Sequence, residues 1–308
     1  MYFLKNRNIV IALTGVFLIL GGCGGGSGSG PVDAMGRISL GSSDGPIHDA
    51  KKVCITFDEI EFMSQGTSTV VTVNLANPVN LLEFQGMNAF PLLTNEELTA
   101  GQYQWMRIGV DAEMGSTGGA GDMLGDSCDG SGSYIVMSDD TIHSLFVPSG
   151  FETGLKLVGG FTVPVNGTAD FTAEFDLMKS ITAPMGPSGD VVLRPTIRLV
   201  NNVEAGTLTG QVDNDLATAD SCAPSVYVFD DGVMPNAIDG TDDPVATAMV
   251  NTETDATGQT EYRYTVGFLL AGDYEVAFTC NGVDFEPMAG KPAAITEKTV
   301  TTVNFLPE

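Results

Sequence analysis

The sequence is poor in positive charge. It holds 13 lysine and arginine residues against 39 aspartate and glutamate residues, so its formal net charge is −26. A surface of this sign repels nucleic acid and anionic lipid headgroups, which makes both poor candidates for partners. It favours cations or cationic partners, or it simply keeps the protein hydrated.

Motifs for the common catalytic chemistries are also missing. The sequence contains no P-loop, no GxSxG, no HExxH, no CxxCH and no dinucleotide-binding fingerprint. Its two histidines, His48 and His143, fall in different turn-rich regions. His143 follows Asp139 and Asp140, which would allow a metal site, although an exposed loop histidine is the simpler interpretation. The sequence therefore predicts a protein that is not an enzyme, with no catalytic residue to name.

Long amphipathic helical patterns are absent, and short stretches rich in Val and Thr recur between turn residues. These features predict an all-β chain with two tandem β-sandwich domains, over residues 35–202 and 203–308. The clearest strand is Lys51–Met63, whose apolar residues change parity near Asp58, as a β-bulge would cause. Turns are expected over residues 42–46, and one helical turn over Thr94–Leu98, capped by Thr94 or Asn95. The other predicted strands lie near residues 36–40, 70–75, 105–110, 155–163, 171–177, 190–200, 206–212, 226–229, 246–250, 262–268, 274–279 and 300–305.

The N-terminal residues predict export and a lipid anchor. Lys5 and Arg7 precede an apolar run over residues 9–20, too short to span a bilayer comfortably. The following Leu20-Gly21-Gly22-Cys23 resembles the lipobox of bacterial lipoproteins. This resemblance implies a signal peptide over residues 1–22, lipidation of Cys23 and a flexible tether to residue 34. Gly24 is not the aspartate of the enteric retention rule, so the outer membrane is favoured. An ordinary secretory leader and an inner-membrane location remain the alternatives.

The other four cysteines are expected to form disulfides, since an even number in an exported chain is typical of them. Four cysteines allow three pairings, of which the economical one keeps each bond within a predicted domain. A metal site is the rival interpretation, but no spacing matches CxxC. The economical pairs are Cys54–Cys128 and Cys222–Cys280.

Calcium is considered because several loops are rich in aspartate. The stretch from Asp239 to Asp243 places hard oxygen ligands in a turn, the kind of setting in which calcium binds. Asp239, Asp242 and Asp243 are the candidate ligands. No acidic stretch matches an EF-hand, and hydrated loops are the alternative.

Residues 36–202 resemble the bacterial lipoprotein family called domain of unknown function 4382. The resemblance is carried in order by the motifs GRISLGSSDGPIHDAKKVCITFDEIEF, LLEFQG, LTAGQYQWMRIGVDA, SYIVM, VPSGFETGLKL, FTVPVNGTADFTAEFDLMKSI and LRPTIRLV. It implies no activity. The chain departs from the family pattern at Ser43 and Gly45, where Thr-Asp-Ala-Pro is more usual.

The second predicted domain carries a separate resemblance. Residues 267–276, GFLLAGDYEV, are similar to a signature of transthyretin-like and carboxypeptidase-regulatory-like sandwiches, and residues 98–103, LTAGQY, echo it in the first domain. The echo suggests two related sandwiches. Some such sandwiches form an internal amide from lysine, which is not expected here because residues 206–212 contain none.

Together these features predict a lipid-anchored protein of the bacterial envelope that acts as a non-catalytic binding or structural module. Its partners would be the membrane, through the N-terminal lipid, and an envelope protein or glycan. The alternatives are a carbohydrate-active hydrolase using two loop carboxylates and a calcium-stabilised adhesin.

Overall fold

The computed structural model describes residues 34–75, 77–113, 128–129, 132–148, 154–182 and 189–307. By its internal contacts the chain divides into residues 1–33 and the unit Ala34–Glu308, and only the second is described here. The predicted signal peptide, Cys23 and most of the tether lie outside the described residues. Within the described part, no helix is long and apolar enough to cross a membrane.

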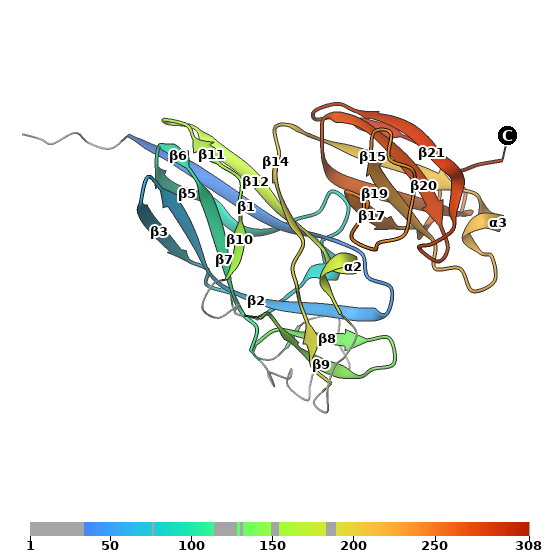
Figure 1. Cartoon of the computed structure of the whole chain (residues 1–308), viewed down its shortest axis with the longest axis horizontal. Helices are drawn as coiled ribbons and strands as arrows, with labels where there is room; N and C mark the ends of the chain where they lie inside the picture. Colours follow the sequence, from blue (N-terminus) through green and yellow to red (C-terminus); the bar gives the residue numbers. More distant parts are fainter. Residues whose placement is uncertain are drawn as a thin grey trace, which may run out of the picture. The chain divides into compact units, whose positions relative to one another are not determined.

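The unit is built almost entirely of β-strands, as predicted (Figure 1). One sheet of its first half runs in the order β14 (Ile197–Asn201), β12 (Thr168–Asp176), β1 (Met35–Gly45) and β5 (Phe90–Thr99). The other runs in the order β10 (Leu155–Leu157), β7 (Trp105–Asp111), β2 (Ala50–Ser64), β8 (Tyr134–Met137), β9 (Ile142–Phe146) and β13 (Val191–Val192). The short strands β3 (Thr67–Thr72) and β4 (Val79–Asn80) pair with β2, and β6 (Gly101–Tyr103) pairs with β11 (Phe161–Val163).

The core of this half lies between the strands of the two sheets. Its aromatic centre consists of Phe62, Tyr103 and Phe161, of which Tyr103 and Phe161 stack at 5.1 Å between ring centroids. The edge of Phe62 meets both rings, at 6.1 and 6.3 Å. Such contacts add to the free energy gained by burying the rings from water.

The predicted β-bulge is present in β2. Its pairing with β7 shifts register between Phe57 and Ile60, so that Phe57 before the bulge and Ile60 after it are both buried. The extra residue restores the apolar face of the strand to the core.

The second half is a sandwich of two four-stranded sheets, grouped in the orange and red part of Figure 1. One sheet runs in the order β18 (Asn251–Thr254), β19 (Thr260–Leu270), β15 (Ala205–Val212) and β22 (Val300–Thr302). The other runs β17 (Ala246–Met249), β16 (Ser225–Asp230), β20 (Gly272–Thr279) and β21 (Phe285–Ile295). A second hydrophobic cluster, which includes Leu208, Val228, Tyr264 and Val276, packs between them. The helical turns are η1 (Leu81–Glu83), α2 (Leu177–Ser180) and α3 (Asn214–Ala217).

The predicted helical turn at Thr94–Leu98 is wrong, because these residues belong to β5. They pair with β1 in antiparallel register, and a shift between Ile38 and Leu40 marks an irregularity there. Asn95 takes a φ of 52° and donates its backbone N–H to Ser39 Oγ, at 3.1 Å. Pairing with a neighbouring strand overrides the local capping signal.

Other predicted boundaries also move. The turn expected over residues 42–46 starts later, because β1 continues to Gly45 in parallel register with β12. The single strand expected over residues 155–163 is two strands, β10 and β11, which pair with β7 and β6. The one expected over residues 190–200 is likewise divided, into β13 and β14.

The two copies of the tyrosine motif make the same local contact. Tyr103 donates its hydroxyl to the Thr99 carbonyl at 2.8 Å, and Tyr274 donates to the Leu270 carbonyl at 2.9 Å. In both cases the acceptor lies four residues before the tyrosine, and a glycine two residues before the tyrosine opens the strand that carries it. The sequence echo therefore corresponds to a repeated local contact.

Candidate functional site

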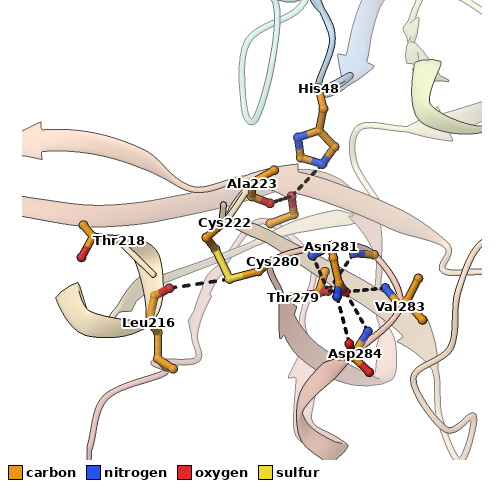
Figure 2. The surroundings of a disulfide bond; sticks show 12 residues. His48, Leu216, Thr218, Cys222, Ala223, Thr279, Cys280, Asn281, Val283 and Asp284 are labelled. Atoms are coloured by element: carbon orange, nitrogen blue, oxygen red, sulfur yellow. Dashed lines mark hydrogen bonds between the residues drawn. A yellow bond between two sulfur atoms is a disulfide. The ribbon is translucent and has the colours of Figure 1, made fainter. Parts of the chain in front are cut away.

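Both expected disulfides are present. Cys54 is bonded to Cys128 with their Cα atoms 5.8 Å apart, and Cys222 to Cys280 with their Cα atoms 4.5 Å apart. Figure 2 shows the second bond beside Leu216, a residue of α3. These four cysteines are therefore structural residues and not metal ligands.

Two of the candidate calcium ligands accept hydrogen bonds from backbone N–H groups of their own turn. Asp243 Oδ1 accepts the backbone N–H groups of Asp239 and Gly240 at 3.0 and 2.9 Å, and Asp239 Oδ1 accepts that of Thr241 at 2.9 Å. Asp242 has a φ of 51°. Across the described ranges, no group of three or more histidine, cysteine, aspartate or glutamate side chains is arranged to hold a metal ion.

The two histidines make different contacts. His48 lies in a turn and its Nε2 is 3.1 Å from Ser225 Oγ on β16, an interaction drawn in Figure 2. His143 is not in a loop as predicted: it lies half-buried on β9, with Nε2 3.0 Å from Thr141 Oγ1. Strand pairing with β8 explains this difference.

The strongest candidate site is a polar pocket of about 270 Å³ at the end of β1, which we call the Asp44 pocket. Its walls come from β1, from the segment after η1, and from β17, β18 and β19. The lining includes Asp44, Glu83, Gln85, Thr247, Arg263 and Thr265. Gly86 in this lining approaches the backbone of β19 closely, since a Cβ placed on Gly267 would lie only 2.0 Å from the Gly86 carbonyl oxygen.

Asp44 is the unusual residue of this pocket. Its side chain is 3% exposed, and neither carboxylate oxygen accepts a well-formed hydrogen bond. Thr247, 5% exposed, also has a hydroxyl oxygen without a partner, and a Cβ on Gly45 would lie 3.4 Å from it. Buried polar atoms nearly always have partners, so Asp44 and Thr247 are exceptions to a general rule.

Electrostatics set Asp44 apart from its neighbours. Burial raises the pKa of Asp44 well above its ordinary value, and the nearby charges of Asp176 and Glu174 raise it further. The backbone N–H groups of Leu177 and Gly45 lower the pKa of Asp44, but they offset only part of this rise. A buried carboxyl in such surroundings is expected to hold a proton or to meet a positive charge.

The positive charges in this region are already engaged. Lys179 pairs with Asp176 at 3.2 Å and donates to the Pro244 carbonyl, and Arg198 pairs with Glu174. Burial still raises the pKa of Glu174 to about 7, against the lowering effect of Arg198.

On the other wall of the pocket, Arg263 pairs with Glu261 at 2.6 Å and with Glu253 at 3.8 Å. No ion pair to Asp44 is formed by any lysine or arginine of the described residues. Asp44 is therefore a buried acid beside two acids, Glu174 and Asp176, that do have cationic partners.

Sequence reasoning missed both orphaned residues. Asp44 lies in a Ser-Ser-Asp-Gly-Pro stretch that is typical of a hydrated turn, and Thr247 lies in an ordinary strand pattern. The one local signal was the departure from the family pattern at Ser43 and Gly45, the two neighbours of Asp44.

Comparison with known proteins gives one family match. The family model described as "Domain of unknown function (DUF4382)" matches residues 35–195, more than half of the chain. No curated protein matches this chain.

Several solved structures show a distant likeness. The minor pilin GBS52 of Streptococcus agalactiae is 11% identical, with 88% of this chain and 97% of that chain covered and a TM-score of 0.19. The shaft pilin SpaA of Lactobacillus rhamnosus GG is 9% identical, with 89% and 98% covered and a TM-score of 0.19. A leucine-rich repeat protein of Bacteroides thetaiotaomicron is 14% identical, with 89% of this chain covered, a TM-score of 0.21, and only 26% of that longer chain matched. At such scores these likenesses carry no argument about this chain.

Proposed function

The chain belongs to the family of the domain of unknown function DUF4382, and from its own residues we propose that it is a non-catalytic binding module, held at the bacterial cell envelope by a lipid on Cys23. The Asp44 pocket is its binding site. The lipobox-like sequence before the tether supports the anchor, and the two disulfides suit an exported protein.

The observation that carries the proposal is the polar pocket of about 270 Å³, whose lining includes the buried residues Asp44 and Thr247. Asp44 and Thr247 are both buried, and leaving such groups without partners costs folding free energy, about 1–3 kcal/mol for each. The acids Glu174 and Asp176 near Asp44 are held in ion pairs, and Glu253 in the pocket lining is paired with Arg263. Asp44 and Glu83 are then the lining acids for which the structure records no ion pair among the described residues.

The anchor is tested by replacing Cys23 with serine. Wild-type protein should partition into the detergent phase, and Cys23→Ser should move to the aqueous phase, because one oxygen cannot carry the acyl chains. A second cysteine variant outside the signal, C222A/C280A, is the control and should stay with the detergent. If Cys23→Ser remains in the detergent phase, the anchor is not a lipid on this residue.

The binding role is tested with purified envelope polysaccharide and peptidoglycan fragments. The full chain should retain one of these ligands without releasing a shortened product, and Asp44→Asn should weaken retention at least tenfold. Hydrolysis of the bound glycan would instead support the carbohydrate-active alternative. No retention of any envelope glycan or protein would end the proposal.

A further inference from the structure

We propose that the outer sheet face around Trp105, in the first half of the unit, rests on the surface of a phospholipid bilayer. This inference depends on the proposed lipid anchor at Cys23 and goes beyond it, because it adds a second contact with the same membrane. It is supported by the exposed apolar side chains of this face, by the distribution of charge on it and by the place where the chain enters the fold.

The outer face of β7 carries the only tryptophan of the chain. Met106 and Ile108 of β7 are buried in the core, so Trp105 points to the opposite side of the sheet. It is partly exposed there and pairs with Met63 of β2. The ammonium group of Lys156, on β10, lies 4.6 Å from the centre of the indole ring. An indole beside a long basic side chain suits the boundary between water and lipid, which satisfies the apolar and polar parts of both.

Exposed valines lie around this tryptophan. Val158 follows β10 directly and is 83% exposed. Val70 of β3 is 50% exposed and pairs with Glu61 of β2, which places it on the same outer face as Trp105. A group of exposed apolar residues on one face is typical of a contact surface. We call this group the Trp105 patch and define it as Met63, Val70, Trp105, Lys156 and Val158.

Charge is distributed unevenly along this face. The patch contains the cation Lys156 and borders Arg107, which is held in an ion pair by one acid of β2. Burial, and then the charges of Asp111 and Glu59, raise the pKa of Asp58, so these three acids lie near one another farther along β2 and β7. The patch itself is therefore free of the acidity of the whole chain, and it fits a zwitterionic headgroup layer better than an anionic one.

The chain enters the fold at the same end as the patch. Ala100 donates its backbone N–H to the Ala34 carbonyl at 2.7 Å, and Trp105 follows Ala100 by five residues, which span at most about 18 Å. Figure 1 shows the beginning of β1 and the strand β3 toward this end. Eleven residue steps lead from Cys23 to Ala34 and reach at most about 40 Å. A lipid on Cys23 would therefore hold the patch at a high effective concentration near the bilayer, so that a weak second contact is sufficient.

A second copy of this chain is the competing occupant of the patch. Its approach would bring together two chains that each carry a formal charge of −26, and such chains repel one another. A zwitterionic bilayer has no such net charge, and the proposed anchor already places it within reach. The membrane is therefore the partner to which we assign this surface.

The experiment measures quenching of tryptophan fluorescence by spin-labelled lipids in vesicles of phosphatidylethanolamine and phosphatidylcholine. The full chain is reconstituted into vesicles whose lipids carry a doxyl label either near the headgroup or near the end of the acyl chain. Since Trp105 is the only tryptophan, its emission reports on the patch alone. We expect the shallow label to quench it about twofold more than the deep label, because tryptophans at a membrane surface lie at the level of the headgroups.

Two variants keep Trp105 and change its surroundings. Val158→Asp and Lys156→Glu should each lower quenching by the shallow label at least about threefold, because a carboxylate opposes contact with the lipid surface. The matched control is Val283→Asp, at a valine that is 65% exposed between β20 and β21, and its quenching should equal that of the wild type. Equal urea midpoints in non-ionic detergent show that a variant keeps the fold, and the second patch variant decides if the first does not.

Co-flotation with the vesicles tests the anchor separately. If the wild type floats but neither label quenches Trp105, or if both folded patch variants are quenched as strongly as the wild type, the patch assignment is overturned and the anchor stands. If the wild type does not float, the anchor is wrong; the Cys23 thiol is then coupled to a maleimide lipid, and the same quenching decides the patch. Trp105 emission that shifts with protein concentration and not with lipid would place a second copy on the patch and overturn the proposal.

Discussion

Removing the two disulfides one at a time gives a demanding test of the structure. The bond Cys222–Cys280 closes a segment of 58 residues and Cys54–Cys128 one of 74 residues. The chain-entropy relation then assigns about 4.2 kcal/mol of stabilisation to the first and about 4.4 kcal/mol to the second at 25 °C. On loop length alone the two bonds should be nearly equal.

Burial should separate them. Cys54 and Cys128 are 0% and 3% exposed and pack with Tyr134 and Val136, whereas Cys222 is only half-buried. Replacing both cysteines of a pair by alanine leaves a cavity where the sulfurs were, and cavity cost grows with burial. We therefore expect C54A/C128A to lose about 1–2 kcal/mol more than C222A/C280A.

Urea unfolding of both double variants and the wild type measures this difference. With a slope between about 1 and 3 kcal/mol per molar, a loss of about 4 kcal/mol lowers the midpoint by about 1.3–4 M. If the two predicted domains unfold independently, each variant should shift only one of two transitions. A loss under about 1 kcal/mol for either pair, or the reverse order of the two, would refute the reasoning.

Three further predictions follow from packing and electrostatics. Phe62→Ala should destabilise the protein by about 3–5 kcal/mol in urea unfolding, because the ring is fully buried against two other aromatic rings; a loss below about 1 kcal/mol would contradict the described core. Gly267→Ala should destabilise the protein by about 1–3 kcal/mol in urea unfolding, because the added Cβ would lie 2.0 Å from the Gly86 carbonyl oxygen; an unchanged unfolding midpoint would contradict this close approach. Between its ordinary pKa of 3.8 and its raised folded pKa, Asp44 keeps a proton that the unfolded chain releases. The stability of the wild type should therefore fall relative to that of Asp44→Asn as pH rises, by at most about 1.4 kcal/mol per pH unit. A stability difference that does not change with pH would be inconsistent with a buried Asp44 that has no ion pair.

Much of the fold was open to prediction because strand patterns are local. Alternating apolar residues in Lys51–Met63 placed β2, and the change of parity near Asp58 placed its bulge. The failures occurred where a neighbouring strand decided the outcome. Thr94–Leu98 looks like a capped turn by itself, but β1 offers it a row of backbone partners, and these outweigh a single capping bond.

The candidate site, in contrast, could not be predicted from local sequence. Asp44 and Thr247 are separated by about two hundred residues, and nothing in either local sequence indicates that both are buried or that they share a pocket. An aspartate in a Ser-Asp-Gly-Pro context is usually hydrated, so its burial comes from contacts made by other elements. Loop carboxylates that look more promising, such as Asp239 and Asp243, instead serve as acceptors within their own turn.

The sequence by itself determined the all-β class, the cysteine pairs that fit one disulfide in each half, and the family, because alternation, turn residues and ordered motifs are written along the chain. Only the tertiary structure decided which polar side chains are buried without hydrogen-bond partners. Burial and the loss of hydrogen-bond partners arise when distant strands pack together, and no local pattern records them.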